Sequence, residues 1–272
     1  MRIAVISDLH LGRGDQTDRG RGHDEALLRF LDYLEADHEM IVLLGDIWEM
    51  LTSQWPGYQT KEAQLVKRAH PEVAQRFATG KYHYIVGNHD RTMGILEDTP
   101  KELVLTIDQM KMIFTHGHQF DIWATRLRYI SEFVVWFSGW ASRLGTHSVT
   151  RFFDWFHNLI TGTSEGTKLG TLESKLIAMS QQRGAQLTII GHTHLPGIFR
   201  SEGHLLVNSG HCLCGTFHFV SIDTHDAEVG VYRVDQMTSD QTDEWDIYLI
   251  DSSKITVSHQ DFDQHETSNR PT

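Results

Sequence analysis

The chain has 272 residues, of which 22% are charged, and a formal net charge of −12 at pH 7. This acidic balance argues against binding of long nucleic acids through a basic surface, while nucleotides held through metal ions stay open. The two cysteines, Cys212 and Cys214, stand one residue apart and offer no disulfide framework, which indicates a reducing compartment. We expect a cytoplasmic protein of one large domain or two, long enough to bury a sizeable core.

Two apolar stretches bear on contact with membranes. The first seven residues run straight into Asp8 and are too short for a secretory signal. The longest stretch, Ile130–Leu144, is interrupted by Glu132 and Arg143, and it falls short of the roughly 20 residues that a spanning helix needs. We therefore expect no spanning helix and leave peripheral contact with a membrane open.

In the first 120 residues, apolar runs end repeatedly in polar turns, a pattern typical of strands buried on both faces. The elements expected there are, in order, a strand at 3–6, a helix capped by Asp24, a strand at 41–44, a helical segment at 61–79 broken before Pro71, a strand at 81–86, and a hairpin of 103–107 with 111–114.

The pattern changes between Gln119 and Gly170, where no strand is apparent. Aromatic and aliphatic residues recur at helical spacing over 127–140 and again over 152–159, and a loop rich in Gly, Ser and Thr follows over 161–170. The first of these helices is apolar around most of its circumference, so several of its sides must be covered.

The alternation of helix and strand then resumes. The expected elements are a helix at 171–183 and strands at 187–190, 197–200, 204–208, 215–222, 228–234 and 246–250. From about Ser252 the sequence is polar and rich in His and Asp, which predicts disorder. We expect a domain over 1–235 that is interrupted by a helical insertion at 119–170 and followed by a C-terminal extension at 236–272.

Polar side chains of metal-binding types follow five of the predicted strands. They are Asp8 and His10, Asp46, Asn88 and His89, His116, and His192 and His194. Ligand sites of open α/β sheets lie beyond the carboxyl ends of strands, and carboxylate, amide and imidazole groups together suit first-row divalent ions. Any one of these histidines alone reads as a satisfied core or surface residue, but that reading does not explain all five sets at once.

The sequences around these residues resemble the calcineurin-like metallophosphoesterase family. The matching blocks, in the family's usual order, are Asp8-Leu-His10, Gly45-Asp46-Ile-Trp-Glu49, Gly87-Asn88-His89-Asp90, His116-Gly117-His118 and Gly191-His192-Thr-His194. The resemblance implies an α/β fold, a four-layer αββα sandwich of two mixed sheets with helices on the outside.

The resemblance also implies a dinuclear metal centre with seven ligands. Asp8, His10 and His194 would hold one ion, and Asn88, His116 and His192 would hold the other. Asp46 would bridge the two ions. Mn²⁺ is the first choice, with Fe²⁺, Zn²⁺ and Co²⁺ as alternatives. Two cations roughly 3.5–4 Å apart can acidify a bridging water for attack on phosphorus. His89 corresponds to the family's catalytic imidazole, and Glu49 to the acidic residue that orients it.

The insertion is similar to that of the UDP-diacylglucosamine hydrolase-like subgroup, which cleaves a pyrophosphate bond in a UDP-linked lipid precursor. The run His116–Asp121 and Asn208-Ser-Gly210 also resemble that subgroup. The chain departs from it at His89 and at Leu195, where some of these hydrolases carry Arg. Candidate substrate residues are Arg126, Arg128, Lys168 and His118.

Several alternatives stay open at this stage. Arg126, Arg128 and Lys168 can also be interpreted as solvated charges. His118 can be interpreted as a support for His116 or as a solvent-facing side chain. The aromatic insertion is a lipid pocket, a membrane-facing surface, a small core of its own or a homodimer interface. The function is a phosphoesterase acting on a phosphodiester or pyrophosphate bond, a phosphodiesterase or phosphatase acting on soluble nucleotides, or a non-catalytic metal-binding scaffold.

Overall fold

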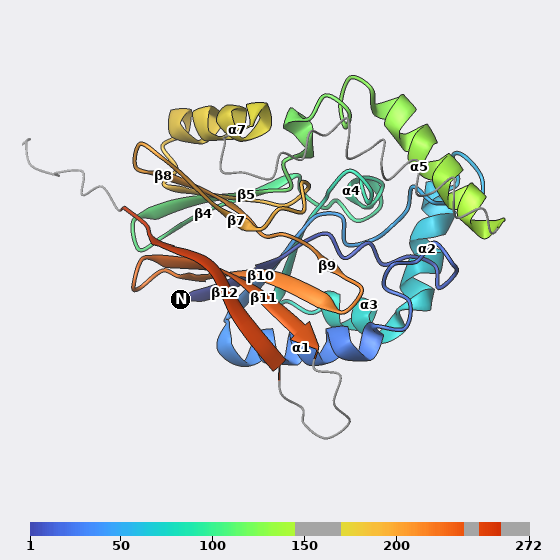
Figure 1. The fold of residues 1–272 in the computed structure, drawn as a ribbon, viewed down its shortest axis with the longest axis horizontal. Helices are drawn as coiled ribbons and strands as arrows, with labels where there is room; N and C mark the ends of the chain where they lie inside the picture. Colours follow the sequence, from blue (N-terminus) through green and yellow to red (C-terminus); the bar gives the residue numbers. More distant parts are fainter. Residues whose placement is uncertain (145–169, 237–244, 257–272) are drawn as a thin grey trace, which may run out of the picture.

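The computed structural model describes residues 1–144, 170–236 and 245–256 of the chain (Figure 1). Its helices and strands, in chain order, are β1 (Arg2–Ile6), α1 (Asp24–Asp37), β2 (Met40–Leu44), α2 (Gln59–Ala69), α3 (Pro71–Phe77), β3 (Tyr82–Ile85), α4 (Met93–Leu96), β4 (Glu102–Ile107), β5 (Met110–Thr115), η1 (His118–Phe120), α5 (Arg128–Arg143), α7 (Thr171–Gln182), β6 (Leu187–Ile190), β7 (Gly197–Ser201), β8 (His204–Asn208), β9 (Cys212–Leu213), β10 (Thr216–Asp223), β11 (Glu228–Gln236) and β12 (Trp245–Lys254).

The strands form two mixed sheets. The first has the order β12-β11-β10-β1-β2-β3, with β9 paired to β10; β1, β2 and β3 run parallel, and β10 to β12 are antiparallel to their neighbours. The second has the order β4-β5-β6-β8-β7, in which β5, β6 and β8 are parallel and the two edge strands are antiparallel. The carboxyl ends of the parallel strands therefore lie at one edge of each sheet.

Side chains that alternate along β2 join the layers. Ile41 and Leu43 belong to the core beneath α1, α2 and α3, whereas Val42 and Leu44 belong to the core between the two sheets. This follows from the strand period of two residues, which points successive side chains to opposite faces. On the far side, α7 covers the second sheet through a smaller cluster that includes Leu176.

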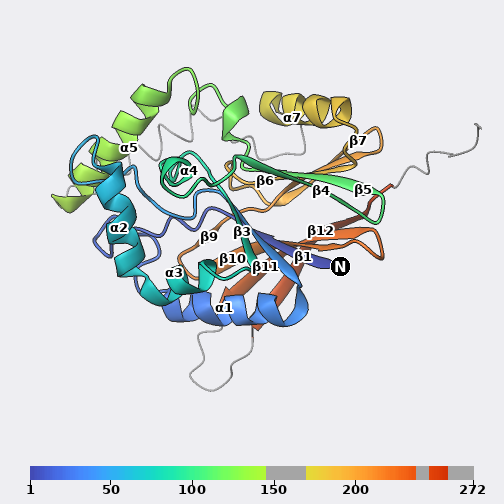
Figure 2. The ribbon, with the colours of Figure 1, turned by 180° about the vertical axis from the view of Figure 1, so that it is seen from behind.

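The four layers are therefore helices, sheet, sheet and helix, with α1 and α3 on one outer face and α7 on the other, while α2 stands at the end of the sandwich beside α5 (Figures 1 and 2). The predicted αββα arrangement of two mixed sheets is confirmed. α4 and α5 lie at one end of the sandwich, near the ends of the central strands. No helix in the described parts of the chain is long and apolar enough to cross a bilayer.

Two local expectations were wrong. Asp24 is the first residue of α1 rather than its cap; His23 precedes the helix without a side-chain cap bond, and the Asp24 carboxylate instead accepts a hydrogen bond from His70 Nδ1 at 2.6 Å. The C-terminal strand is longer than predicted, because β12 continues to Lys254 and pairs with β11. Disorder therefore does not begin at Ser252.

Other expectations fall partly outside the described residues. The helix expected over 152–159, most of the loop over 161–170 and the last part of the C-terminal extension are in the ranges that the structure does not describe. The division of the chain at residue 235 stays a prediction. Cys212 and Cys214 are both free thiols, and the short strand β9 was not predicted.

Candidate metal centre

The segments that follow β1, β2, β5 and β6 are joined to one another by backbone hydrogen bonds. The N–H of Asp8 donates to the carbonyl of Gly45 at 3.1 Å, and the N–H of His10 to the carbonyl of Asp46 at 3.0 Å. In the second sheet, the N–H of Gly191 donates to the carbonyl of His116 at 3.2 Å. These bonds hold the polar strand ends of each sheet at fixed positions beside one another.

The backbone at these strand ends adopts an uncommon conformation. Five of the predicted ligands have positive φ: Asp8 (55°), His10 (47°), Asp46 (53°), His192 (68°) and His194 (60°). Non-glycine residues rarely enter this left-handed region, although Asp and His do so more readily than most. Such strain is retained where the surrounding structure enforces it, and it is concentrated at functional sites.

Two glycines allow the strand ends to approach. A Cβ atom on Gly87 would lie 2.0 Å from Oδ1 of Asp46, so no larger residue fits there while Asp46 keeps its place. Gly45 has φ +85°, and a Cβ atom on it would lie 2.7 Å from the ring of His116. Both glycines of the matching blocks are therefore required by the packing of predicted ligands.

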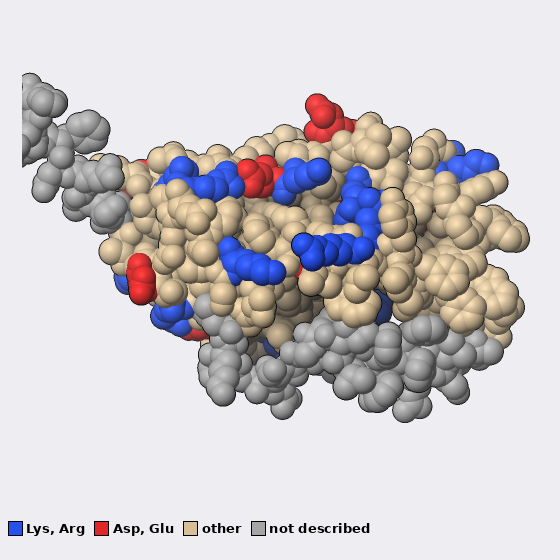
Figure 3. All heavy atoms as spheres, turned by 90° about the horizontal axis from the view of Figure 1, so that it is seen from above, with Lys and Arg blue, Asp and Glu red and all other residues tan. Residues whose placement is uncertain are grey.

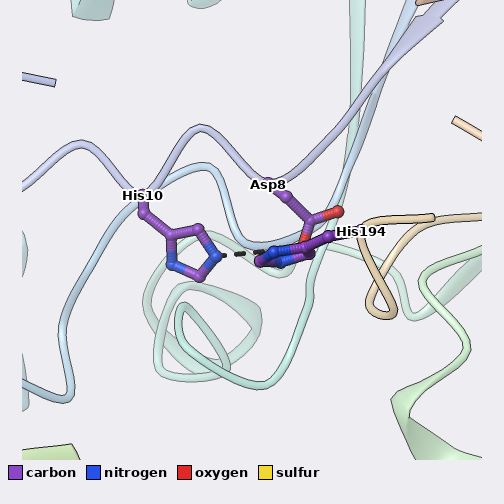
Figure 4. Close-up of side chains that lie close together, drawn as sticks. All are labelled: Asp8, His10 and His194. Carbon is purple, nitrogen blue, oxygen red and sulfur yellow. Dashed lines mark hydrogen bonds and ion pairs between the residues drawn. The ribbon is translucent and has the colours of Figure 1, made fainter. Parts of the chain in front are cut away.

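One group of three predicted ligands is formed by Asp8, His10 and His194, which come from the end of β1 and from the loop after β6 (Figure 4). His194 Nε2 lies 3.0 Å from Asp8 Oδ1, and His10 Nε2 lies 3.8 Å from the same oxygen. One ligand atom from each residue lies within 4.8 Å of the other two. A single cation between these atoms would contact all three side chains.

A second group is formed by Asp46, His116 and His192, whose ligand atoms also lie within 4.8 Å of one another. His116 Nδ1 donates to the carbonyl of Leu44 at 2.8 Å, which directs His116 Nε2 toward Asp46 Oδ2 at 3.2 Å. His192 Nε2 contacts Asp121 Oδ2 at 2.8 Å. Because His116 Nε2 is also 4.0 Å from Asp8 Oδ1, the two groups adjoin.

Three buried atoms of the predicted ligands find no partner in hydrogen-bond geometry among the described residues: His10 Nε2, Asn88 Oδ1 and His116 Nε2, the last despite its 3.2 Å approach to Asp46 Oδ2. Native proteins pair nearly all buried polar atoms, so unpaired ones require an explanation. These are an amide oxygen and two imidazole nitrogens, all of which coordinate divalent ions. The residues present therefore fit the metal ions that the sequence predicts.

Buried opposite charges dominate the electrostatics of this site. Burial would raise the pKa of the Asp46 carboxyl, but the imidazoles of His116 and His89 hold it well below its usual range. Burial lowers the pKa of His116, whereas the carboxylates of Asp46 and Asp8 raise it to about 10. Buried carboxylates need positive charge beside them, and divalent cations would supply it in place of protons.

His89 and Glu49 form a hydrogen-bonded pair beside these groups. His89 Nδ1 donates to Glu49 Oε2 at 2.7 Å, and the other carboxylate oxygen accepts the backbone N–H groups of Leu51 and Thr52 at 2.9 and 3.2 Å. Burial would lower the pKa of His89, but Glu49 and Asp46 raise it to about 9. The hydrogen bond from Nδ1 to the Glu49 carboxylate favours the protonated form of this imidazole.

Glu49 also contacts a predicted ligand. Its Oε2 atom lies 3.3 Å from His10 Nδ1, and the rings of His10 and His89 meet edge to face with centroids 4.6 Å apart. The three residues are close enough that they could hold a metal ion themselves. One carboxylate thus fixes the orientation of two imidazoles.

The candidate substrate residues differ in their positions. His118 is 8% exposed and its ring centroid lies 5.5 Å from that of His116, so the solvent-facing alternative for His118 was wrong. Arg126 is exposed, and Arg128 on the first turn of α5 pairs with Glu132 at 2.6 Å. Lys168 lies outside the described residues.

Two further residues of this region were not predicted. The Asp121 carboxylate accepts a hydrogen bond from His192 Nε2. Arg91 donates from Nη2 to the carbonyl of Ala124 at 3.2 Å. Asp121 ended a run that resembles the hydrolase subgroup, which was a usable signal. Arg91 directly follows a matching block, but its residue type alone did not distinguish it from a solvated charge.

Residues 1–141 match the family model of the calcineurin-like phosphoesterase superfamily domain, and no curated protein sequence matches the chain. Among solved structures, a "predicted phosphoesterase" from Streptococcus pneumoniae is 16% identical, with 91% of this chain and 97% of that chain covered and a TM-score of 0.42. Vps29 from Chaetomium thermophilum is 13% identical, with coverage of 97% and 100% and a TM-score of 0.47. A zinc complex of Vps29 from Entamoeba histolytica is 16% identical, with coverage of 92% and 99% and a TM-score of 0.44.

Proposed function

The chain belongs to the calcineurin-like phosphoesterase superfamily, whose members are metal-dependent, and from this premise we propose a two-metal hydrolase of phosphodiester or pyrophosphate bonds. The first candidate substrate is the pyrophosphate bond of a UDP-linked lipid precursor. The observation that carries the proposal is the convergence of two adjoining ligand groups with three buried, unpaired ligand atoms.

In this proposal two ions would share the seven predicted ligands. Asp8, His10 and His194 would hold one ion, and Asn88, His116 and His192 would hold the other. Asp46 would contribute its carboxylate to both. The mixture of carboxylate, amide and imidazole groups favours Mn²⁺, with Fe²⁺, Zn²⁺ and Co²⁺ as alternatives. Bound divalent cations would acidify a water molecule near neutral pH and neutralise charge on the phosphoryl oxygens.

The chain's own residues supply the proton transfer. The oxygen of the attacking water forms a new bond to phosphorus, the bond from phosphorus to the leaving oxygen breaks, and His89 donates a proton to that oxygen. The proton lost by the water then restores His89 through solvent. Glu49 keeps the imidazole charged and fixes its direction, because its carboxylate accepts from Nδ1 and leaves Nε2 for the leaving group.

The helical insertion supports a lipid-linked substrate. Aromatic side chains on α5 contact one another, with Phe133 and Phe137 stacked at 6.2 Å and Phe137 and Trp140 at 5.9 Å. Phe133 is 59% exposed and Tyr129 80% exposed. Exposed apolar patches of this kind serve lipid or protein contact. We call Tyr129, Phe133, Trp136, Phe137 and Trp140 the aromatic face of α5.

Charge on the same side of the molecule suits an anionic membrane surface. Lys and Arg side chains gather on the face seen from above in Figure 3, over α7 and the segment leading into α5, although the whole chain is acidic. Arg126 and Lys175 are exposed in these two elements. We place the protein in the cytoplasm with peripheral contact to the membrane, where anionic lipid attracts basic residues.

Hydrolysis of soluble nucleotides is the second candidate. The metal groups by themselves require only a phosphate ester, and nothing in their contacts depends on an acyl chain. In that case the aromatic face would join two copies of the chain as a homodimer. A scaffold without catalysis is disfavoured, because the ligand set is complete and the pair of His89 with Glu49 is in place.

A phosphate-release screen with Mn²⁺ distinguishes these functions. It compares a UDP-linked acylated sugar, soluble nucleotides, and bis(4-nitrophenyl) phosphate as a simple diester. Preferred cleavage of the acylated substrate supports the first candidate, and equal cleavage with and without acyl chains supports the second. Metal binding without turnover of any of the three would contradict both and leave the scaffold.

A further inference from the structure

Two buried nitrogen atoms beside the metal centre have no role in the proposed proton transfer. His118 Nδ1 and Arg91 Nε are shielded from solvent and find no hydrogen-bond partner in the part of the chain that the structure describes. Unpaired buried donors and acceptors are rare in native proteins because they destabilise the fold. A ligand atom that bonds to either nitrogen would remove the cost at that nitrogen.

Arg91 is held in place from two sides. It follows Asp90, whose carboxylate accepts the backbone N–H of Gly87 at 2.6 Å and that of Ile47 at 2.7 Å, so the chain at this point is fixed against the loop after β2. At the other end of the side chain, Nη2 donates to the carbonyl of Ala124 at 3.2 Å. The guanidinium is thus anchored while its Nε–H is left to bind something else.

His118 approaches the same region from the second sheet. Its ring centroid lies 5.5 Å from that of His116 and 6.4 Å from that of His192. Burial has the largest effect on the pKa of His118 and lowers it. The positive charge of His116 lowers it further, and the positive charge of Arg91 acts in the same direction. Arg91 directly follows the block Asn88-His89-Asp90, and His118 lies two residues after His116, so both side chains belong to the strand ends that carry the predicted ligands.

We propose that Arg91 and His118 form a subsite for an anionic oxygen of the substrate outside the phosphoryl group under attack. A guanidinium binds phosphate oxygens with well-directed, charge-assisted hydrogen bonds. The ligand class is a pyrophosphate diester, in which a second phosphoryl group is bonded directly to the first. This inference rests on the proposed function, and it assigns to two named residues the preference for its pyrophosphate alternative over simple phosphodiesters.

The charged side chains around Arg91 favour the binding of an anion. Burial and then the positive charge of Arg128 lower the pKa of the Arg91 guanidinium, which means that the two cations repel each other. The negative charge of Glu132 offsets part of this repulsion, but its carboxylate is already paired with Arg128 Nε at 2.6 Å. An anion bound between the two arginines would lower the repulsion further.

The first arm of the test compares two substrates with excess Mn²⁺. Arg91→Gln should lower kcat/KM for UDP-N-acetylglucosamine about 10- to 100-fold, as loss of a hydrogen bond to a charged group predicts, and should change kcat/KM for bis(4-nitrophenyl) phosphate less than about threefold. His118→Phe keeps a ring, and it should lower kcat/KM for UDP-N-acetylglucosamine more than kcat/KM for bis(4-nitrophenyl) phosphate. Arg68→Gln, an exposed charge on α2, is the matched control.

The second arm measures binding without cleavage of a pyrophosphate. UDP and UMP are compared as inhibitors of bis(4-nitrophenyl) phosphate hydrolysis, and the wild type should bind UDP about tenfold more tightly than UMP. Arg91→Gln should bring this ratio close to one, and Arg91→Lys, which keeps the charge but lacks Nε–H, should recover part of it. Metal content and the melting midpoint identify any variant that does not fold.

The outcomes separate the subsite from the proposed function. A UDP preference that survives in folded, metal-loaded Arg91→Gln and Arg91→Lys would overturn the subsite, and so would an equal loss of affinity for UDP and UMP. If UDP-N-acetylglucosamine is not cleaved but the UDP preference disappears in the variants, the subsite stands and only the assignment of the cleaved bond fails.

Discussion

At the strand ends, four predicted ligands are buried and the other three are half-buried, whereas on α5 Tyr129, Phe133 and Trp140 are exposed. Asp8 and His116 are fully buried, while Phe133 is 59% exposed. The first arrangement is rigid enough to place reacting groups, and the second suits an adaptable apolar contact. In the proposed function, the strand ends would carry the chemistry and α5 would contact an acyl chain or a membrane.

Among the described residues, hydrogen bonds near both ends of α5 join the two regions. Asp121, at the start of the insertion, contacts His192, and Ala124 accepts from Arg91. At the other end of α5, Arg143 donates to Asp15 at 2.8 Å. Because these contacts attach the insertion to the ligand loops, variants that affect only one region are needed to separate their roles.

The largest effect is expected at the shared carboxylate. Asp46→Asn should lower turnover of every phosphate ester about 1000-fold or more and weaken binding of both metal ions, because several kcal/mol of charge stabilisation would be lost. Turnover and bound metal are measured on the same samples. Asp98→Asn, at an exposed residue that also has positive φ, is the control. Full activity in Asp46→Asn would show that the carboxylate does not serve the reaction.

A somewhat smaller loss is expected at the imidazole that is not a ligand. His89→Ala should lower kcat about 100- to 1000-fold, the usual contribution of a positioned general acid, while two metal ions remain bound. Inductively coupled plasma mass spectrometry gives the metal content, and His83→Ala, an exposed histidine on β3, is the control. Loss of one ion together with activity would instead make His89 part of a metal site with His10 and Glu49.

Variants of the aromatic face should have the opposite effect: they should weaken membrane contact and leave the hydrolysis of a simple diester intact. Phe133→Ser with Trp140→Ser should weaken association with anionic liposomes about tenfold, since exposed apolar area supplies that binding, and should leave hydrolysis of bis(4-nitrophenyl) phosphate unchanged. Sedimentation with liposomes measures the association, and Leu65→Ser on α2, 39% exposed, is the control. A double variant that stays on liposomes but loses a solution dimer would make the face an interface between copies.

The smallest effect concerns a histidine outside both regions. His70 lies between Asp24 Oδ1 at 2.6 Å and Asp18 Oδ2 at 2.9 Å. Burial lowers the pKa of His70, but hydrogen bonds and charge from Asp18, then Asp24, raise it above the ordinary value. The stabilisation is therefore complete below about pH 6.5 and is lost as pH rises through the raised pKa.

His70→Gln should accordingly cost about 1–2 kcal/mol of unfolding free energy at pH 6 and less at pH 9.5. Urea unfolding at the two pH values measures this, with turnover per metal-loaded molecule unchanged. A loss of stability that is larger at the higher pH would contradict the assigned protonation. The contrast with His116 would show that contact between imidazole and carboxylate serves stability in one place and metal binding in another.

The sheets were predictable because their residues carry the signal locally. Continuous apolar runs such as Ile41–Leu44 and the polar residues after them give both the strand and its chemistry. The left-handed conformation of Asp8 was not predictable, because Asp occupies several regions of backbone space and only the packed neighbours select one. Asp24 was misassigned for a similar reason: its tertiary partner, His70, competes with the local cap.

The subsite and the insertion show where prediction ended. Arg91 looks like any charged residue until its bond to Ala124 is known. The last four residues of β12, 251–254, are polar, and only their pairing with β11 makes them part of the strand. The apolar pattern of α5 predicted a helix correctly but not what its exposed rings contact. Long-range packing decides these features, and periodicity along the chain does not report it.

Anomalous diffraction from crystals grown with Mn²⁺ tests the central claim most directly. We predict two peaks per chain, roughly 3.5–4 Å apart, with Asp46 contacting both, Asp8, His10 and His194 around one, and Asn88, His116 and His192 around the other. A single peak, or peaks that Asp46 does not share, would contradict this account of the protein's chemistry.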